Sequence, residues 1–344
     1  MNVGVDLGYG FLKVTDGSHE WIVPSVVGTG RDVAYHSELT LRTEEQDNLV
    51  VEVDHQRYFV GSLAVRQSGI AVRSLAENRP ADPNAKILFL AALGLVAGRT
   101  GEVFNVVTGL PTMYYGPYRD DLNAMIMGDH RVTFHSGGNA VEKLFTVDRA
   151  RIIPQPFGTV YDAFLDRAGN VENEALASSR VGVIDIGFRT CDFVVSDRLE
   201  YIERLSFSTS TGLSAAYGLV ADGILRQFRI AKTNYELDGV MSSGILRAGG
   251  RDQDITGLRD DAYRQVADKV VTEAQSVWSM NDLDAIYITG GGGKALAPFL
   301  VPHFENVQLA DSPQVANVHG FWKLANKIFA SWAEGQPQRA AGGE

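Results

Sequence analysis

The sequence predicts an α/β protein of two domains, with one β-sheet in each half. Three observations support this prediction: the length of 344 residues, the mixture of strand-like and helix-like segments along the chain, and the similarity between residues 3–14 and 181–195. A chain of this length suits two domains of ordinary size. Mixed strand and helix patterns throughout are typical of α/β architectures.

The composition is that of a globular protein with an ample core. Apolar residues make up 45% and charged residues 21% of the chain, and the net charge is −11. This acidic balance, without a dense Lys/Arg cluster, argues against direct nucleic-acid binding. No apolar run is long enough to span a bilayer, and the N-terminus shows no signal peptide. The single cysteine, Cys191, excludes an internal disulfide and a multi-cysteine zinc site, so we expect a cytoplasmic protein.

The two similar segments each predict a strand, a tight turn and a second strand. In each, a β-branched apolar run leads to an aspartate, Asp6 or Asp185, and a glycine follows two positions later. Glycine lets backbone N–H groups approach a ligand, and successive N–H groups form an anion-binding nest. Alone, each segment could be a hairpin with a polar turn residue. Two such turns facing one cleft would instead suit a polyphosphate with its metal ion.

Other elements follow in order between these segments. Asp82 and Pro83 are a typical helix start, and Gly98 is a typical stop. Residues 30–48 are polar and are expected to form an exposed loop. The remaining expected elements are a strand over 21–27, a hairpin of 49–53 and 57–60, a helix over 84–97, a strand over 103–108, a helix over 114–127, a hairpin of 131–135 and 143–147, a strand over 151–154 and a helix over 157–166.

The second half is expected to continue in the same way. The hydroxyl-rich segment 208–211 suggests an N-cap for the helix that follows it. Residues 231–257 are polar and glycine-rich, and no element is assigned to them. The expected elements are a strand over 201–207, a helix over 213–228, an amphipathic helix over 260–278, a strand over 285–289, a helix from Lys294, a last helix over 315–332 and a disordered tail from Glu334.

A run of four glycines follows the strand expected over residues 285–289. Without side chains, this backbone could pack against a flat ring or a phosphate, and the helix after it would favour an anion. The alternative is a flexible turn. The run is not a P-loop, because Ala295 follows Lys294 where Ser or Thr would be required.

As an ordered set, these features resemble the actin, sugar-kinase and heat-shock chaperone superfamily over nearly the whole chain. The set comprises the Asp6 hairpin, residues 154–158, the Asp185 hairpin and residues 289–293. Within the superfamily, three further segments are similar to plasmid-segregation actins of the ParM type and their archaeal relatives: residues 184–192, 317–324 and 58–61.

The resemblance implies a two-domain actin-like fold, built from a duplicated ribonuclease H-like unit, with a nucleotide cleft between the domains. Domain I would comprise residues 1–154 and 311–333, and domain II residues 155–310. Residues 334–344 would form the disordered tail.

The resemblance also implies roles for individual residues. Asp6 and Asp185 would organise Mg²⁺ through water, and Gln155 would act with them in catalysis by orienting the attacking water. The residues expected to bind ATP or ADP are Gly8, Tyr9 and Gly10 with Lys13 in a first phosphate loop, Gly187, Phe188 and Arg189 in a second, and Gly290, Gly291, Gly292 and Gly293 in an adenosine loop, with Gly212 on the opposite wall.

Some of these positions depart from the family pattern or have plain alternatives. Tyr9 and Phe188 are bulky, so phosphate contact there must run through backbone N–H groups. Arg189 is either a phosphate clamp or a solvent-facing strand residue. Lys13 could be a solvated strand lysine, and Gln155 could be a helix-entry residue between two prolines.

Three functions are compatible with this pattern. The first is a cytomotive ATPase that polymerises with ATP and disassembles after hydrolysis, for plasmid segregation or cell organisation. Its partners would be further copies of itself and a DNA-binding adaptor protein. The second is a small-molecule kinase of the same superfamily, and the third is a nucleotide-binding scaffold without turnover.

Overall fold

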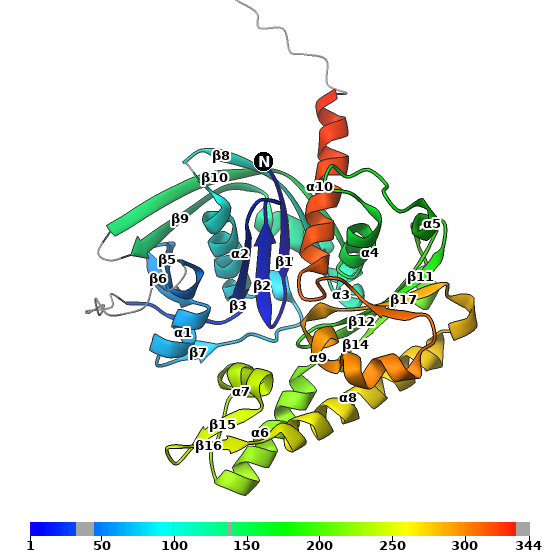
Figure 1. The fold of residues 1–344 in the computed structure, drawn as a ribbon. Helices are drawn as coiled ribbons and strands as arrows, with labels where there is room; N and C mark the ends of the chain where they lie inside the picture. Colours follow the sequence, from blue (N-terminus) through cyan, green and yellow to red (C-terminus); the bar gives the residue numbers. More distant parts are fainter. Residues whose placement is uncertain (32–44, 99, 137–138, 335–344) are drawn as a thin grey trace, which may run out of the picture.

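The computed structural model describes residues 1–31, 45–98, 100–136 and 139–334. Two sheets, one in each half, are separated by a pair of helices, α4 (Phe157–Phe164) and α10 (Ala316–Glu334) (Figure 1). The first sheet has ten strands in the order β3-β2-β1-β8-β10-β9-β5-β6-β4-β7. The second has six, in the order β13-β12-β11-β17-β18 with β14 paired to β12. The predicted two-domain α/β fold class is confirmed.

The first half contains most of the chain's strands. Its strands are β1 (Asn2–Leu7), β2 (Phe11–Thr15), β3 (Glu20–Pro24), β4 (Val27–Thr29), β5 (Leu49–Val53), β6 (Gln56–Val60), β7 (Ala71–Val72), β8 (Glu102–Leu110), β9 (Gly128–Ser136) and β10 (Asn139–Pro154). Its helices are α1 (Ser62–Gln67), α2 (Pro83–Val96) and α3 (Thr112–Ile126), with short 3-10 helices η1 (Glu45–Asp47) and η2 (Arg79–Ala81).

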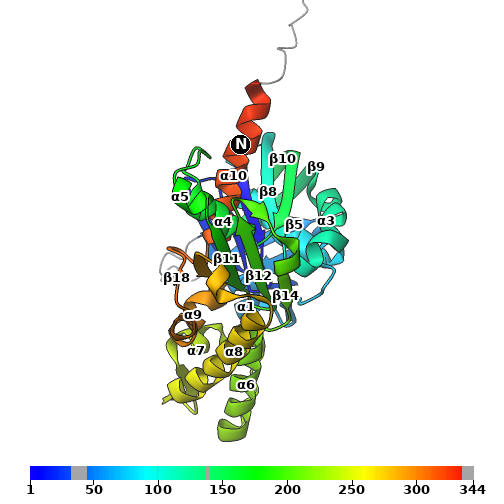
Figure 2. The same cartoon turned by 90° about the vertical axis from the view of Figure 1, so that its right-hand side faces the viewer.

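The second half combines a smaller sheet with a helical layer. Its strands are β11 (Arg180–Ile186), β12 (Cys191–Asp197), β13 (Glu200–Tyr201), β14 (Phe207–Thr209), β17 (Ala285–Thr289) and β18 (Val307–Leu309), and β15 (Ile245–Ala248) and β16 (Arg251–Asp254) form a separate hairpin. Its helices are α5 (Glu174–Ala177), α6 (Ser214–Phe228), α7 (Asp238–Ser243), α8 (Thr256–Val277) and α9 (Gly290–Leu300), with 3-10 helices η3 (Glu203–Leu205), η4 (Asn234–Leu237), η5 (Met280–Asp282) and η6 (Val301–His303). In Figure 2, α6, α7 and α8 lie at the end of the molecule opposite α10.

The two halves repeat one local arrangement around their first strands. β1 pairs with β2 antiparallel and with β8 parallel. β11 pairs with β12 antiparallel and with β17 parallel. In both sheets the first strand therefore ends directly before the turn glycine, and its neighbour on the other side is a parallel strand. The internal similarity of the sequence thus corresponds to the same strand arrangement in each half.

Three large cores and a small one around Phe59 hold the described part of the chain together. One lies between the first sheet and α2, and a second lies between the second sheet and helices α6, α8 and α9. The third joins the halves, because it combines Val107 and Ile153 of the first sheet, Val183 of the second, Phe157 of α4 and Phe321 of α10. The sheets are therefore not independent bodies but share buried apolar surface. The domain boundaries expected at residues 154 and 311 remain a prediction.

The helices α4 and α10 cross in backbone contact. A Cβ at Gly320 would collide with the carbonyl group of Gly158, and a Cβ at Gly158 would lie 2.6 Å from Cα of Asn317. Only glycine permits this approach, since any side chain would force the helices apart. A third glycine, Gly4, packs β1 equally closely on α10. Small residues therefore set the distance between the two sheets.

Several expected elements differ in detail. The strand expected over residues 21–27 is wrong, because two strands replace it: β3 ends at Pro24, which cannot donate to a ladder, and β4 begins at Val27 near the opposite edge of the sheet. The separate strands expected over 143–147 and 151–154 form one strand, β10, with a register shift between Val147 and Arg149. The hairpin of β9 and β10 is confirmed, but its glycine turn lies outside the described residues.

Three further expectations are wrong in the second half. The single strand expected over residues 201–207 is replaced by β13 and β14, with η3 between them. The hydroxyl-rich segment 208–211 does not cap α6, which begins at Ser214 without a side-chain cap; Thr209 and Thr211 instead donate to Glu273 of α8 at 2.9 and 2.8 Å. The helix expected from Lys294 begins at Gly290, so the glycine run is its first turn.

The two chain segments expected to be irregular are described only in part. The unassigned residues 231–257 contain η4, α7 and the β15–β16 hairpin. Most of the loop expected over residues 30–48 lies outside the described residues, as does the tail from residue 335, and Glu334 belongs to α10.

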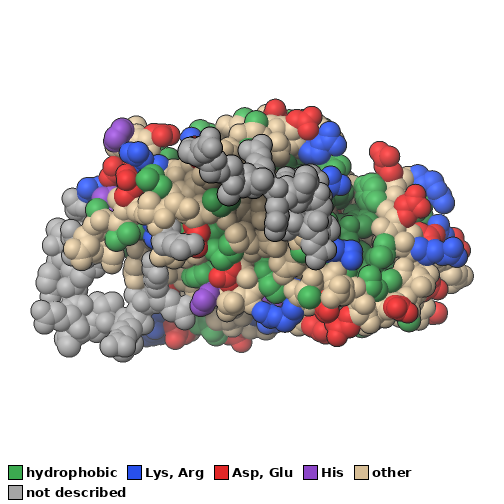
Figure 3. Space-filling view, turned by 90° about the horizontal axis from the view of Figure 1, so that it is seen from above, with side chains coloured by type: hydrophobic (Ala, Val, Ile, Leu, Met, Phe, Trp, Pro, Cys, Tyr) green, Lys and Arg blue, Asp and Glu red, His purple; other side chains and the backbone are tan. Residues whose placement is uncertain are grey.

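The face seen from above carries mixed charge. On the face shown in Figure 3, Lys and Arg side chains are scattered among Asp and Glu side chains where residues are described. Within the described ranges, no helix combines the length and apolar character that a bilayer crossing requires.

The helix crossing gives a stability prediction. Gly320→Val should lower the free energy of unfolding by about 1–3 kcal/mol or more, because the added side chain meets backbone and not a flexible neighbour. Urea unfolding measures this change. The matched control is Gly218→Ala in α6, where a Cβ meets no atom within 4 Å; it should stabilise the protein by up to about 1 kcal/mol. Equal stability of Gly320→Val and wild type would contradict the proposed crossing.

Candidate functional site

A cavity of about 610 Å³ lies between the two halves. The turn after β1 and the turn after β11 both contribute to its wall, as do the first residues of α9. The predicted site residues that line it are Gly8, Tyr9, Gly10, Lys13, Gln155, Asp185, Gly187, Phe188, Gly290, Gly291 and Gly292. The structure therefore brings together residues that are up to 284 positions apart in the sequence (292 − 8).

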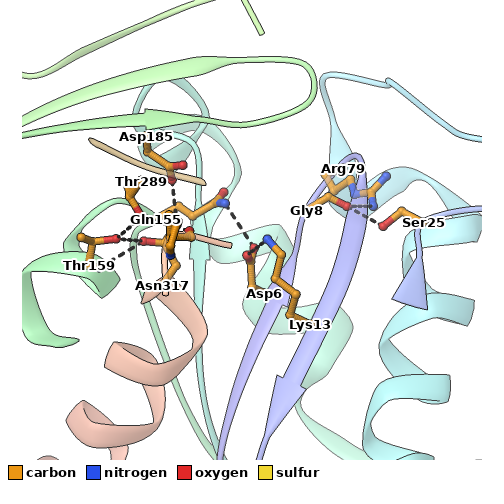
Figure 4. Close-up of polar contacts among 11 residues, drawn as sticks. Asp6, Gly8, Lys13, Ser25, Arg79, Gln155, Thr159, Asp185, Thr289 and Asn317 are labelled. Atoms are coloured by element: carbon orange, nitrogen blue, oxygen red, sulfur yellow. Dashed lines mark hydrogen bonds and ion pairs between the residues drawn. The ribbon is translucent and has the colours of Figure 1, made fainter. Parts of the chain in front are cut away.

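The first carboxylate, Asp6, is buried at the end of β1 and is held by two partners (Figure 4). Lys13 Nζ donates to Asp6 Oδ2 at 2.7 Å, and Gln155 Nε2 donates to Asp6 Oδ1 at 3.2 Å. Lys13 is opposite Asp6 in the β1–β2 register, which places its side chain on the same face of the sheet. In Figure 4 the Gln155 side chain lies between Asp6 and Asp185. The amide thus binds Asp6, and Gln155 lines the same cavity as Asp185.

The second carboxylate, Asp185, is held from the helix pair between the sheets. Asn317 Nδ2 of α10 donates to Asp185 Oδ2 at 2.7 Å. Asn317 Oδ1 in turn accepts from the hydroxyl of Thr159 at 2.8 Å, and the hydroxyls of Thr159 and Thr289 lie 3.0 Å apart. This buried network joins α4, α10, β11 and β17. The position of Asp185 therefore depends on the same helix crossing that separates the sheets.

Burial strongly affects the protonation of Asp185. Desolvation raises the pKa of Asp185 to about 7, and the nearby carboxylates Asp192 and Asp6 add to this shift. The hydrogen bond from Asn317 opposes it. A cation placed beside Asp185 would favour the charged form, since an opposite charge reverses the cost of burial.

In the first turn, the carbonyl oxygens are tied back from the cavity. Gly8 O accepts from Ser25 Oγ at 2.6 Å and from Arg79 Nη2 at 3.1 Å, and Gly10 O accepts from Ser25 N at 2.9 Å. In a trans peptide the C=O and the next N–H point in opposite directions. Tyr9 lines the cavity and neither Ser25 nor Arg79 does, so the N–H of Tyr9 is directed away from these two residues; among the described residues this N–H has no partner.

In the second turn, the carbonyl oxygens are held by backbone N–H groups. Gly187 O accepts from Leu213 N at 3.0 Å, and Phe188 O accepts from Ser214 N at 2.7 Å. The N–H groups of Phe188 and Arg189 are directed the opposite way, and within the described chain neither has a hydrogen-bond partner. Both turns therefore present unpaired donors, which is the property of an anion-binding nest.

The glycine run completes the wall beside Asp185. Gly290 has φ of +85°, and a Cβ there would collide with the Asp185 carboxylate. A Cβ at Gly292 would lie 2.6 Å from the side chain of Ile186. The run lets the first turn of α9 pack directly on the end of β11. Gly290 N donates to Pro313 O at 2.8 Å, and Gly290, Gly291 and Gly292 line the cavity.

The bulky residues of the two turns have their side chains engaged elsewhere. Tyr9 OH donates to Ala76 O at 3.0 Å, and burial raises the pKa of Tyr9 to about 12. Phe188 packs edge-on against Tyr217 with ring centroids 5.1 Å apart. Arg189 Nη2 donates to Glu77 Oε1 at 2.9 Å. In this structure, the Arg189 side chain thus binds a carboxylate of the first half and does not line the cavity.

Four of the predicted residues lie behind the cavity wall: Asp6, Arg189, Gly212 and Gly293. Asp6 contacts the wall through Lys13 and Gln155. The backbone of Gly212 packs on the second turn, where a Cβ would overlap the backbone of Arg189. Gly293 packs against the side chain of Ile288.

The sequence prediction did not include another buried carboxylate, Asp192. Its Oδ1 accepts from Thr112 N at 2.6 Å and from Ser208 Oγ at 2.5 Å, and Ser208 Oγ also accepts from Met113 N at 2.9 Å. Asp192 and Ser208 of the second half therefore bind the N-terminus of α3 in the first half. Burial raises the pKa of Asp192, and the hydrogen bond from Ser208 opposes the shift. Only the Asp192 position, two residues beyond Thr190, was visible in the motif.

The far end of the cavity is lined by the second half alone. Its wall is formed by Tyr217, Asp238, Met241, Ser242, Arg259, Asp260, Tyr263, Lys294, Pro298 and Phe299. Apolar surface with a few polar groups is typical of a small-molecule site. Sequence reasoning missed these residues because most belong to the segment that received no assignment or to one face of α8.

A buried ion pair joins the two halves beside this wall. Arg73 donates to Asp238 through Nη1–Oδ1 at 3.1 Å and Nη2–Oδ2 at 2.5 Å, and its guanidinium lies 4.7 Å from the Phe188 ring centroid. The Arg73 side chain is 2% exposed. The bidentate geometry fixes both partners.

Two family models match this chain. Residues 4–158 match the N-terminal domain of actin-like proteins, and residues 183–301 match the C-terminal domain of archaeal MreB-like actin homologues. The chain belongs to the actin-like proteins. No curated protein sequence is significantly similar to it.

Solved structures confirm the actin-like two-domain fold. A ParM protein from Clostridium botulinum, solved as a 15-stranded filament, has a TM-score of 0.80 at 22% identity, over 95% of this actin-like chain and 99% of the other. The archaeal actin homologue Ta0583 in complex with ADP has a TM-score of 0.76 at 18% identity, over 95% and 99% of the two chains. The actin-like protein Alp7A has a TM-score of 0.75 at 18% identity, over 97% and 99%.

The residues of this actin-like site fit a hydrated magnesium ion. Mg²⁺ prefers oxygen ligands, keeps several waters and is usually held by one or two carboxylates together with substrate phosphates. Asp6 and Asp185 would supply the carboxylates beside the two turns. Among the described residues, no group of three or more His, Cys, Asp or Glu side chains could hold a metal directly.

The raised pKa of Asp185 predicts a pH-dependent stability of the nucleotide-free protein. The folded pKa, about 7, exceeds the unfolded value of about 3.9, so folding takes up a proton. The stabilisation is complete below the unfolded pKa and is lost as pH rises through the folded pKa. Relative to Asp185→Asn, wild type should lose on the order of a few kcal/mol between about pH 4 and pH 8.

Urea unfolding in EDTA, at several pH values for both proteins, measures this difference. A gap between wild type and Asp185→Asn that stays constant over the whole range would contradict the assignment.

Proposed function

We propose that this chain is a cytomotive ATPase that binds Mg-ATP in the cavity between its halves, polymerises, and hydrolyses ATP to drive disassembly. The observation that carries this proposal is the pair of turns whose carbonyl groups are tied back and whose N–H groups are unpaired, together with Gln155 and Asp185 at one cavity and Asp6 bound to Gln155 behind its wall. Donors from two turns suit a chain of phosphates, and the carboxylates suit its metal ion.

Each group would have a distinct part in this reaction. The N–H groups of Tyr9, Phe188 and Arg189 would bind phosphate oxygens. The ammonium group of Lys13, a compact charge, would leave Asp6 and bind the terminal phosphates. Gln155 would orient the attacking water, which is positioning more than strong base chemistry. When bound, Mg²⁺ would neutralise charge on the phosphates.

The nucleotide would also favour the closed arrangement of the halves. The turn after β1 belongs to the first sheet and the turn after β11 to the second, so a triphosphate bound to both would hold them together. Loss of the terminal phosphate would remove part of that connection. A change in the relative position of the halves is a physical route from hydrolysis to weaker subunit contacts.

Assembly and cargo are the finer parts of the proposal. The solved ParM relative forms a filament, and the ADP complex is of the archaeal homologue. We infer head-to-tail filaments of this chain, since a heterologous contact that does not close gives open filaments. A DNA-binding adaptor would link the filament to DNA in segregation, because the mixed surface charge does not favour direct binding.

Sedimentation with ATP, with ADP and without nucleotide, combined with phosphate release, tests this function. We expect pelleting and phosphate release with Mg-ATP and neither without nucleotide. Protein that stays in the supernatant under every condition would contradict polymerisation. ADP formation only in the presence of a sugar would support the kinase alternative, and ATP binding without turnover would support the scaffold alternative.

Gln155→Ala should slow phosphate release by about 10²-fold, because misplacing the attacking water has a cost of that order. ATP affinity should stay near that of wild type, since the amide does not bind the phosphates directly in this proposal. Filaments should therefore form with ATP and disassemble more slowly. Gln265→Ala, at an exposed position of α8, is the matched control and should behave as wild type. Normal hydrolysis by Gln155→Ala would exclude the assigned role.

A further inference from the structure

The two phosphate turns differ in what holds their carbonyl groups. In the second turn, both anchors are backbone N–H groups at the start of α6, from Leu213 and Ser214. Such hydrogen bonds do not depend on which side chains these two positions carry. In the first turn, Gly8 O is held by two side chains, those of Ser25 and Arg79 (Figure 4). The orientation of this turn therefore depends on specific residues from distant segments.

Arg79 is unusual because it is a buried cation without an ion pair at hydrogen-bond distance. The residue is 3% exposed, and its nearest carboxylate is Asp82 at 3.8 Å. Its other contacts are to carbonyl groups: Nη2 donates to Gly8 O at 3.1 Å and Nη1 to Ser74 O at 3.3 Å. The guanidinium also lies 4.9 Å from the ring centroid of Tyr9. Burial of such a group is costly, so its contacts must compensate.

Two of these contacts, to Gly8 O and to the Tyr9 ring, act on the same unit of the first turn. The Gly8–Tyr9 peptide has its oxygen bound by Arg79 and Ser25, and the Tyr9 side chain after it is covered by Arg79 and bonded to Ala76 O. Glycine at position 8 would otherwise allow this peptide to rotate, since it accepts either sign of φ. A rotated peptide would present its carbonyl oxygen to the cavity, where an anion would be repelled.

We propose that Arg79 is a positioning residue for polyphosphate binding, which holds the Gly8–Tyr9 peptide with its N–H toward the cavity. This inference rests on the proposed nucleotide function. Arg79 does not touch the nucleotide, since it does not line the cavity. It acts through Gly8, and Ser25 shares the task.

Affinities for Mg-ATP, Mg-ADP and adenosine, measured by titration calorimetry, test this role. Arg79→Met should weaken Mg-ATP and Mg-ADP binding by about 10- to 100-fold, the value of one hydrogen bond to a charged group. Adenosine has no phosphates, so its affinity should change little. Ser25→Ala should cause a smaller loss of the same kind without any change of charge. Arg79→Lys keeps the charge and one donor, and should recover part of the affinity.

The matched control is Lys143→Met. Lys143 is also a partly buried cation bound to two carbonyls, Gly94 O at 2.6 Å and Ala97 O at 3.1 Å, at the end of α2. The Lys143→Met variant should be less stable than wild type, but the ratio of its affinities for ATP and adenosine should not change. Thermal unfolding of each variant separates loss of fold from loss of the turn.

The outcomes distinguish the possible explanations. Equal weakening of ATP and adenosine by Arg79→Met would mean that Arg79 is only structural and would overturn the proposal. Loss with Arg79→Met but none with Ser25→Ala would assign the effect to charge and would also overturn it. If the wild type binds ATP and Arg79→Met binds it equally well, this inference alone fails. If the wild type binds no ATP, the proposed function fails and this inference fails with it.

Discussion

The backbone contact between α4 and α10 determines where the two sheets lie and hence where their strands end. Gly158 and Gly320 let the helices meet without intervening side chains, and Gly4 brings β1 onto the same helix. At this crossing Asn317 links Thr159 to Asp185. The scaffold and the second carboxylate are therefore fixed by one set of contacts. A change in the helix distance would move the carboxylate relative to the first turn.

The paired hairpins could be predicted from the sequence because their information is local. A β-branched run, an aspartate and a glycine two positions later are sufficient to indicate strand, turn and strand in each half. Gln155 and Asp185 were also expected to meet at one cavity, since equivalent strands of a repeated unit end at equivalent places; Asp6, expected there too, lies behind its wall and is bound to Gln155. The start of α2 could also be predicted from neighbouring residues, Asp82 and Pro83, and the structure confirms it.

Other features could not be predicted because they depend on contacts across the fold. Thr211 was expected to cap a helix, but its hydroxyl donates a hydrogen bond to Glu273, which is distant in the sequence. The sequence around Arg79 and Ser25 contains no pattern that indicates their hydrogen bonds to Gly8 O. The β15–β16 hairpin is short and polar, and its turn depends on Gly249 and Gly250 at positive φ. Its sequence therefore shows neither the alternating pattern of a strand nor the 3.6-residue pattern of a helix.

The ion pair of Arg73 with Asp238 affects how the halves can separate. An exposed pair such as Arg189 with Glu77, whose carboxylate side chain is 65% exposed, is weakened by dissolved ions. The Arg73 side chain is 2% exposed and is screened far less. Separating Arg73 from Asp238 would require the guanidinium to be rehydrated. We therefore expect this contact between the halves to respond less to the salt content of the cell than the contact of Arg189 with Glu77.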